Sequence, residues 1–191
     1  EHSLSTKLHN YWFKINNINA IYEKKLVEEN DIGKIISDIR ENKIQGINVT
    51  VPFKKKVIEF LDQMTTEARE SKSVNMLYMN KDKIIGHNTD ISGFELSLRH
   101  VKYNVDKKKV LILGAGGVVS SLIVALKKMN PSKIILTNRT KSKAEKIKES
   151  FQEIEIEEWG KLPDFDFIIN ATSLGLNKND DLNLDYKKIG E

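Results

Sequence analysis

The stretch that decides the fold is KVLILGAGGVV, residues 109–119, in which an apolar run leads into a glycine-rich turn. Residues 109–113 are typical of a buried strand, and residues 117–129 have the pattern of a helix. Gly114 allows a tight turn, while Gly116 lets the backbone approach a bound group closely. A strand, a glycine turn and a helix in this order place backbone N–H groups toward a pyrophosphate, so the stretch indicates a dinucleotide site. A packing turn without a ligand is the alternative, and Val119 replaces the third glycine of the general motif.

Strand and helix patterns alternate downstream of this turn. We predict strands over residues 133–137 and 166–170, and a helix over residues 140–151 in which Ala144 and Ile147 share one face. Such alternation indicates a parallel sheet, and the glycine turn makes it a doubly wound (Rossmann) fold. The remaining chain is too short for the full six-strand order, so we expect this fold to be incomplete.

The residues upstream have the pattern of a mixed α/β domain that ends at about residue 93. Strands are predicted from alternating apolar residues, helices from apolar residues three and four apart, and starts from capping residues. The predicted elements are a helix capped by Ser5, a strand over 20–26, a helix from Asn30 or Asp31, a strand over 46–51, a helix over 54–64, a hairpin of 74–79 and 83–87, and a linking helix from Asp90 or Ser92.

Lys54 occupies an unusual position in the stretch NVTVPFK, residues 48–54. Pro52 has no N–H for a sheet ladder, so the strand ends there and a helix is expected to follow. Lys54 would then lie near the positive end of a helix dipole, where a cation is disfavoured. A disfavoured charge of this kind indicates a functional lysine, with an ordinary surface lysine as the alternative.

The residues after the second predicted strand indicate the cofactor. NAD sites place an acid about 20 residues beyond the glycine turn to bind the ribose 2′-hydroxyl. This chain has Asn138 there, followed by Arg139. No carboxylate would repel a 2′-phosphate, and a guanidinium can pair with one, so NADP is favoured. Lys143 is either a second phosphate contact or a solvated helix charge.

The composition excludes several classes of protein. The 191 residues are 39% hydrophobic, and no apolar run is long enough to span a bilayer. The absence of cysteine excludes disulfides and cysteine nucleophiles, and it fits a reducing cytoplasm. The net charge is +4, but the 31 basic residues are interleaved with 27 acidic ones, which is typical of a solvated surface rather than of a nucleic-acid site. No cluster has the spacing of a metal site.

Six short motifs, in this order, resemble those of the shikimate dehydrogenase family: Ser3-Leu4-Ser5, Asn48 to Lys54, Val74-Asn75 with Asn88-Thr89-Asp90, Gly114 to Gly117, Asn138-Arg139-Thr140, and Asn170-Ala171-Thr172-Ser173. The resemblance runs almost from end to end. It implies a substrate-binding domain over residues 1–93 followed by an incomplete NADP-binding Rossmann domain over residues 94–191. It also implies that both ends of the family's chain are missing here.

The implied activity is the NADP-dependent interconversion of 3-dehydroshikimate and shikimate, a step of aromatic amino acid biosynthesis. Lys54 and Asp90 match the family's catalytic pair, in which an ammonium stabilises developing negative charge on oxygen and delivers a proton. Asp90 as a helix N-cap is the alternative. His9 and His87 are expected to be structural. The implied substrate-binding residues are Ser3, Ser5, Thr50, Asn75 and Asn88, and the implied cofactor-binding residues are Gly114, Ala115, Gly116, Gly117, Asn138, Arg139, Thr140, Lys143, Thr172 and Ser173.

Departures from the family's pattern leave substrate choice open. Lys72-Ser73 stands where the family usually has Gly-Ala, and Ile91 follows Asp90 where it usually has Gly. The alternatives are a dehydrogenase for quinate or a related cyclic hydroxy acid using NAD(P), and a ligand-binding module without turnover. We expect a cytoplasmic monomer or homodimer that binds a small molecule, with no nucleic acid, membrane or metal as a partner.

Overall fold

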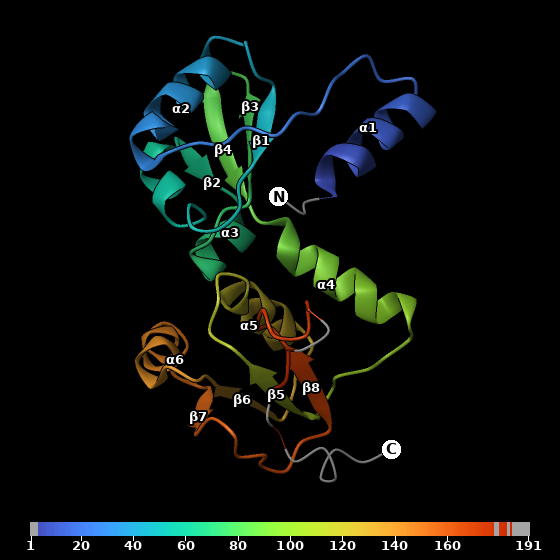
Figure 1. The fold of residues 1–191 in the computed structure, drawn as a ribbon, viewed down its shortest axis with the longest axis vertical. Helices are drawn as coiled ribbons and strands as arrows, with labels where there is room; N and C mark the ends of the chain where they lie inside the picture. The colour runs from blue at the N-terminus through green and yellow to red at the C-terminus, as the bar shows by residue number, and fades with distance from the viewer. Residues whose placement is uncertain (1–3, 178–179, 183, 185–191) are drawn as a thin grey trace. The chain divides into compact units, whose positions relative to one another are not determined.

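The computed structural model describes residues 4–177, 180–182 and 184, and it divides the chain into two compact units, residues 1–35 and 36–191. Each unit is described by itself. Figure 1 labels their helices and strands. No helix in the described part of the chain has the length and apolar character needed to cross a membrane.

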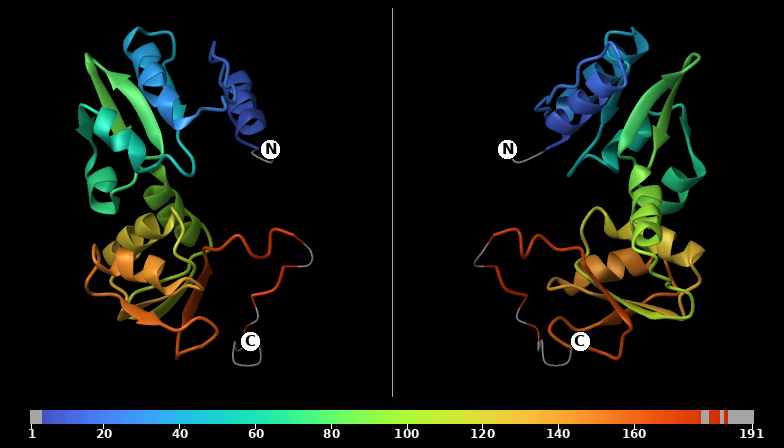
Figure 2. Two further views of the ribbon diagram at one scale, coloured as in Figure 1. Left: turned by 60° about the vertical axis from the view of Figure 1, so that its left-hand side comes forward. Right: turned by 90° about the vertical axis from the view of Figure 1, so that its right-hand side faces the viewer.

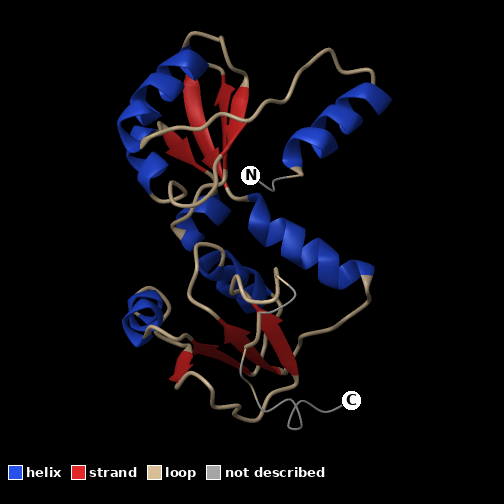
Figure 3. Cartoon of the chain, viewed as in Figure 1, coloured by secondary structure: helices blue, strands red, loops and turns tan. Residues whose placement is uncertain are grey.

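The first unit consists of helix α1 (Ser5–Ile15), an irregular segment and the 3₁₀ helix η1 (Glu29–Asp31), after which α2 (Ile32–Arg40) begins. The N-cap of α1 is Leu4, so the prediction that Ser5 caps this helix was wrong. The predicted strand over residues 20–26 was also wrong, because this segment is a loop (Figure 3). The Asn10 side chain donates to the carbonyl of Tyr22 and accepts from its N–H, both at 2.9 Å, and so takes the place of a neighbouring strand.

The second unit begins with a mixed four-stranded sheet in the order β1-β3-β4-β2. Its strands are β1 (Gly46–Asn48), β2 (Gln63–Met64), β3 (Met76–Asn80) and β4 (Lys83–His87), and the last two form the predicted hairpin. β1 and β3 are antiparallel, whereas β2 pairs with β4 in parallel. The predicted strand over residues 46–51 was therefore right in place but too long.

The region between β1 and β3 differs from the predicted helix over residues 54–64. It contains the 3₁₀ helix η2 (Lys56–Phe60) and strand β2, and helix α3 (Thr66–Ser71) follows without having been predicted. The cause is tertiary pairing: the Asp62 carboxylate accepts the N–H of Ile84 at 2.7 Å, and the next two residues join the sheet. Lys54 thus lies in a loop before a short 3₁₀ turn, and the prediction that it lies near the positive end of a helix dipole was wrong.

Helix α4 (Thr89–His100) leads to the second sheet, which is entirely parallel and has the order β7-β6-β5-β8. Its strands are β5 (Lys109–Leu113), β6 (Lys133–Thr137), β7 (Glu155–Glu157) and β8 (Phe167–Asn170), alternating with α5 (Val119–Lys128) and α6 (Lys141–Lys148). In chain order the strands lie as 3-2-1-4, which is the arrangement of a doubly wound nucleotide fold. The predicted α/β class is confirmed, and only β7 was not predicted.

The two faces of this parallel sheet bury different side chains. Val110 and Ile112 belong to a core with α4, α5 and α6, while Leu111 and Leu113 pack on the opposite face with the loop that carries Trp159. Figure 2 shows the helices beside the sheet from two sides. The packing of α5 on the sheet places the start of this helix at the carboxyl ends of the strands, where doubly wound folds bind ligands.

Candidate active site

Lys54 and Asp90 are brought together although they lie 36 residues apart, with Lys54 Nζ donating to Asp90 Oδ2 at 2.7 Å. Their side chains are 15% and 23% exposed, so the ion pair is partly shielded and still reachable from solvent. The carbonyl of Lys54 accepts the N–H of Val74 at 2.8 Å, which ties the loop after β1 to the start of β3. A held ammonium of this kind can stabilise negative charge that develops on a neighbouring oxygen.

Asn75 holds the other carboxylate oxygen of Asp90. Its Nδ2 donates to Asp90 Oδ1 at 2.8 Å, and its Oδ1 accepts the N–H of Thr89, the first residue of α4, at 2.9 Å. Asn75 is only 8% exposed. Both oxygens of Asp90 are thus bonded, one to an ammonium and one to an amide, which fixes the plane of the carboxylate.

Asn88 is the N-cap of α4, and it is fully buried. Its Oδ1 accepts the N–H of Asp90 at 3.0 Å. The predictions that Asp90 or Ser92 starts this helix, and the alternative that Asp90 is its cap, were therefore wrong. The amide of Asn88 faces the protein interior, where it binds the backbone of Asp90, and it does not line an open surface.

Of the three remaining predicted substrate contacts, the structure describes Thr50 and Ser5. Thr50 is exposed in the loop after β1, where its carbonyl accepts the N–H of Phe53 at 2.9 Å. Ser5 is partly exposed at the start of α1 in the first unit, and Ser3 lies outside the described residues. Among the described residues predicted for catalysis and substrate binding, Asp90 is the common partner: Lys54 and Asn75 bind its carboxylate, and Asn88 binds its backbone N–H.

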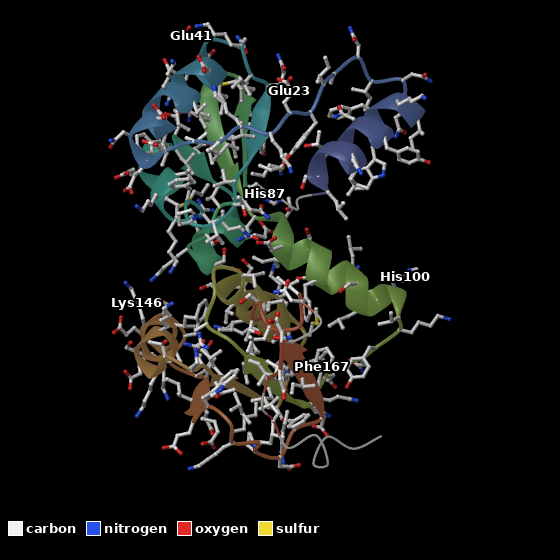
Figure 4. All side chains as sticks on the ribbon, in the orientation of Figure 1. Glu23, Glu41, His87, His100, Lys146 and Phe167 are labelled. Carbon is white, nitrogen blue, oxygen red and sulfur yellow. The ribbon has the colours of Figure 1, made fainter. Side chains whose placement is uncertain are left out.

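Both histidines expected to be structural have protein partners. His87, labelled at the end of β4 in Figure 4, has its Nδ1 2.9 Å from the hydroxyl of Thr65, the N-cap of α3. The His9 ring stacks on Tyr22, with ring centroids 4.3 Å apart. These contacts agree with structural roles.

The glycine turn has the shape that a bound pyrophosphate requires. Gly114 has φ +101°, and a Cβ there would lie 2.9 Å from Thr172 Cγ2 and 3.0 Å from the backbone of Ala171. At Gly116 the nearest such atom is the carbonyl oxygen of Ala171 at 3.7 Å, so the backbone remains approachable. The turn opens α5, whose first N–H groups favour an anion. These residues fit a dinucleotide.

Asn138 connects the glycine turn to the residues expected to select the cofactor. Its Oδ1 accepts the N–H of Ala115 at 3.0 Å, and its Nδ2 donates to the carbonyl of Thr140 at 2.7 Å. Arg139 and Lys143 are exposed beside this connection. The side chain of Asn138 therefore positions both loops, and the exposed cations remain available for a phosphate.

The loop after β8 lies against the same turn. Asn170 Oδ1 accepts the N–H of Thr172 at 3.0 Å, and Thr172 Oγ1 accepts the N–H of Leu174 at 3.0 Å. Ser173 is exposed between them. This hydrogen-bonded loop packs directly against the glycine turn, which is why a Cβ at Gly114 would meet Thr172 and Ala171.

One polar residue near the site was not singled out from the sequence. Ser121 lies in the first turn of α5, is fully buried, and accepts a hydrogen bond from Asn88 Nδ2 at 2.9 Å. The available signal was the pair Ser120-Ser121 inside an otherwise apolar helix. Among the described residues, no group of three or more His, Asp or Glu is placed to hold a metal ion.

A doubly wound dinucleotide fold together with a lysine–aspartate pair places this chain in the class of NAD(P)-linked oxidoreductases. Residues 1–77 match the family model described as shikimate dehydrogenase substrate binding domain. Residues 95–177 match the model described as shikimate / quinate 5-dehydrogenase. The chain belongs to the shikimate dehydrogenase family.

Similar proteins agree with this assignment. Shikimate dehydrogenase (NADP(+)) of Pelagibacter ubique is 56% identical over 191 residues, which are all of this chain and 72% of that protein. The crystal structure of shikimate dehydrogenase from Aquifex aeolicus is 35% identical with a TM-score of 0.87, covering 97% of this chain and 70% of that one. The Thermus thermophilus enzyme, solved in complex with NADP(H) and shikimate, is 26% identical with a TM-score of 0.82, covering 92% of this chain and 66% of that one.

Proposed function

We propose that this chain forms the greater part of an NADP-dependent shikimate dehydrogenase, in which Lys54 and Asp90 are the catalytic pair. The observation that carries the proposal is the 2.7 Å contact between Lys54 Nζ and Asp90 Oδ2, with Asn75 on the other carboxylate oxygen. Family membership supplies the reaction, the interconversion of 3-dehydroshikimate and shikimate. The ion pair supplies a group suited to its proton transfer.

The proposed mechanism assigns each group one task. When bound, NADP supplies the hydride chemistry. In the direction of ketone reduction, Lys54 stabilises the negative charge that develops on the carbonyl oxygen and gives that oxygen a proton. Asp90 orients the ammonium and, together with Asn75, keeps it at one position. In shikimate oxidation the hydroxyl proton returns along the same path.

We further propose how the other residues divide the work. Residues 1–93 bind the substrate and residues 94–191 bind NADP. Ser3, Ser5 and Thr50 would bind the substrate's carboxylate and hydroxyls, and Asn75 would combine a substrate contact with its hold on Asp90. Asn88, proposed from the resemblance as a substrate contact, is better assigned to positioning because it is fully buried. The proposed cofactor-binding set is Gly114, Ala115, Gly116, Gly117, Asn138, Arg139, Thr140, Lys143, Thr172 and Ser173.

Selection of NADP over NAD would come from Arg139, with Lys143 as a weaker point charge. Support for this comes from the absence of an acid at position 138 and from the exposure of both cations beside the glycine turn. We also propose that the protein acts in aromatic amino acid biosynthesis and that it is a cytoplasmic monomer or homodimer.

The test is a set of initial rates for the full-length protein with shikimate and with quinate, each measured with NADP and with NAD. We expect the highest kcat/KM for shikimate with NADP. An equal or higher value for quinate would identify a quinate dehydrogenase instead, and equal values for the two cofactors would refute the role given to Arg139. Binding of shikimate without turnover would identify a ligand-binding module.

A further inference from the structure

A buried group of polar side chains lies where α3, the start of α4 and the first turn of α5 meet. Asn88 and Ser121 are both fully buried, and Ser71 and Ser73 are each 1% exposed. The neighbouring residues of α5 are apolar and buried from Leu122 to Leu126. Polar groups in such surroundings are costly unless their hydrogen bonds are made, so the group requires an explanation.

Two hydrogen bonds connect Ser121 to the backbone of Asp90. Asn88 Nδ2 donates to Ser121 Oγ at 2.9 Å, and Asn88 Oδ1 accepts the N–H of Asp90 at 3.0 Å. The side chain of Asp90 in turn holds Lys54. Ser121 is therefore linked to the proposed catalytic pair through a single buried amide.

Ser121 also lies next to the proposed cofactor site. It is the third residue of α5, which begins at Val119 directly after the glycine turn. The first N–H groups of this helix are those that a pyrophosphate would bind. An adjustment of the first turn of α5 on cofactor binding would therefore move one acceptor of the Asn88 amide.

The amide of Asn88 has more acceptors than hydrogens. Its two N–H bonds face Ser71 Oγ at 3.1 Å, the carbonyl oxygen of Ser73 at 2.8 Å and Ser121 Oγ at 2.9 Å. Without Ser121, both hydrogens would still have an acceptor. The bond to Ser121 is thus not needed to satisfy the amide. It adds a third contact, which restricts the position of the amide.

We propose that Ser121 is a positioning residue, which holds Asn88, and through it Asp90, in register with the cofactor-binding turn. This inference rests on the proposed function, because it concerns how the same site is kept in order. Ser121 touches neither substrate nor Lys54 in this account. It acts only through the amide of Asn88.

The kinetic test compares three variants of the full-length protein. Ser121→Ala removes the acceptor, and Ser121→Cys restores the lost volume with a somewhat larger atom that is a much weaker acceptor. Ser120→Ala, at the neighbouring buried serine, is the matched control. We expect kcat for shikimate oxidation to fall about tenfold in both Ser121 variants, as a small misplacement of a reacting group does, with both KM values within about twofold and the control unchanged. A fall in Ser121→Ala that Ser121→Cys restores would mean packing alone and would overturn the proposal, as would kcat within about twofold of the parent in both.

A spectroscopic test needs no turnover. The amide resonance of Asp90 is followed in ¹H–¹⁵N spectra of the parent, Ser121→Ala and Ser120→Ala proteins, with and without NADP. We expect NADP to shift this resonance in the parent and the control, and to shift it by less than half as much in Ser121→Ala. No shift in the parent, or an equal shift in Ser121→Ala, would overturn the link. A parent that fails to oxidise shikimate but shows the expected spectra would refute the proposed function and leave the link standing.

Discussion

Replacing Lys54 by Met in the full-length protein tests the proposed chemistry most directly. Met keeps most of the side-chain volume and removes the ammonium. The side chain is 15% exposed, and its contact with Asp90 measures 2.7 Å, so the lost interaction is a short, partly shielded, charge-assisted hydrogen bond. Such a bond contributes about 1.5–3 kcal/mol to the ground state, and the pair is coupled to charge that appears only in the transition state.

The expected loss therefore falls mainly on kcat. Removing a positioned proton donor lowers the rate by about 10²–10⁴-fold, and we expect Lys54→Met to lie in this range with KM for shikimate raised only a few-fold. Asp90→Asn should also be strongly impaired, because the amide no longer holds a cation. The double variant should be no slower than the slower single variant, since groups that act as a unit are not additive.

The assay follows NADPH formation from shikimate at saturating NADP, with unfolding curves to confirm that each variant is folded. Lys55→Met is the matched control, because Lys55 is the next residue and is exposed. Lys54 is not the proton donor if Lys54→Met retains more than about a tenth of the parental kcat, or if Lys55→Met loses as much. Losses that multiply in the double variant would show that Lys54 and Asp90 act independently.

Three further predictions concern the cofactor loop and the interior. Arg139→Ala should weaken NADP binding about tenfold or more and leave NAD binding nearly unchanged in calorimetric titrations, because only NADP carries the 2′-phosphate. Gly114→Ala should strongly lower the midpoint of urea unfolding, because φ is +101° and a Cβ would meet the loop after β8 at 2.9 Å. Gly93→Ala, with nothing within 4 Å in an exposed part of α4, should instead stabilise by about 0.5–1 kcal/mol. Ser73→Ala should leave the free energy of unfolding unchanged or raise it, because the buried Ser73 hydroxyl has no partner among the described residues, whereas Ser71→Ala should cost about 1 kcal/mol or more by removing a 2.7 Å bond to a helix carbonyl.

The nucleotide-binding half could be predicted closely because its signals are local. β5 and β6 begin and end at the predicted residues, since strands buried on both faces are continuous apolar runs bounded by turns. The glycine turn fixed the start of the first helix to within two residues. β7 was missed because its sequence, Glu155–Glu157, is only three residues long and mostly charged.

The other half depends on partners distant in the sequence. The apolar spacing of residues 57–61 favours a helix, yet Asp62 binds the backbone of Ile84 and draws the next residues into a parallel pairing with β4. A local pattern cannot reveal that pairing. The same holds for residues 20–26, where Leu26 is 99% exposed and the strand-like composition meets no neighbouring strand.

The candidate site, too, could be predicted from the sequence only in part. The motifs identified Lys54 and Asp90, and the structure brings them into contact. They could not show that Asn75 holds the carboxylate of Asp90 and that Asn88 holds its backbone N–H, because amides beside a helix start can face either a ligand or the backbone. Burial decides between these settings, and burial is a property of the folded chain.

The burial of Asn88 is itself informative. Capping a helix requires one side-chain oxygen for a free N–H, and exposed Ser, Thr, Asp and Asn residues supply it in most helices. Asn88 is 0% exposed, and its donor side is bonded to groups on two other segments of the chain. Capping alone explains neither the burial nor the donor contacts. A requirement to hold Asp90 at a fixed place relative to α5 explains both. It also explains why Asn occupies this position, because the amide oxygen caps the helix while a separate NH₂ group donates to Ser73 and Ser121, whereas Asp has no donor and Ser has a single hydrogen.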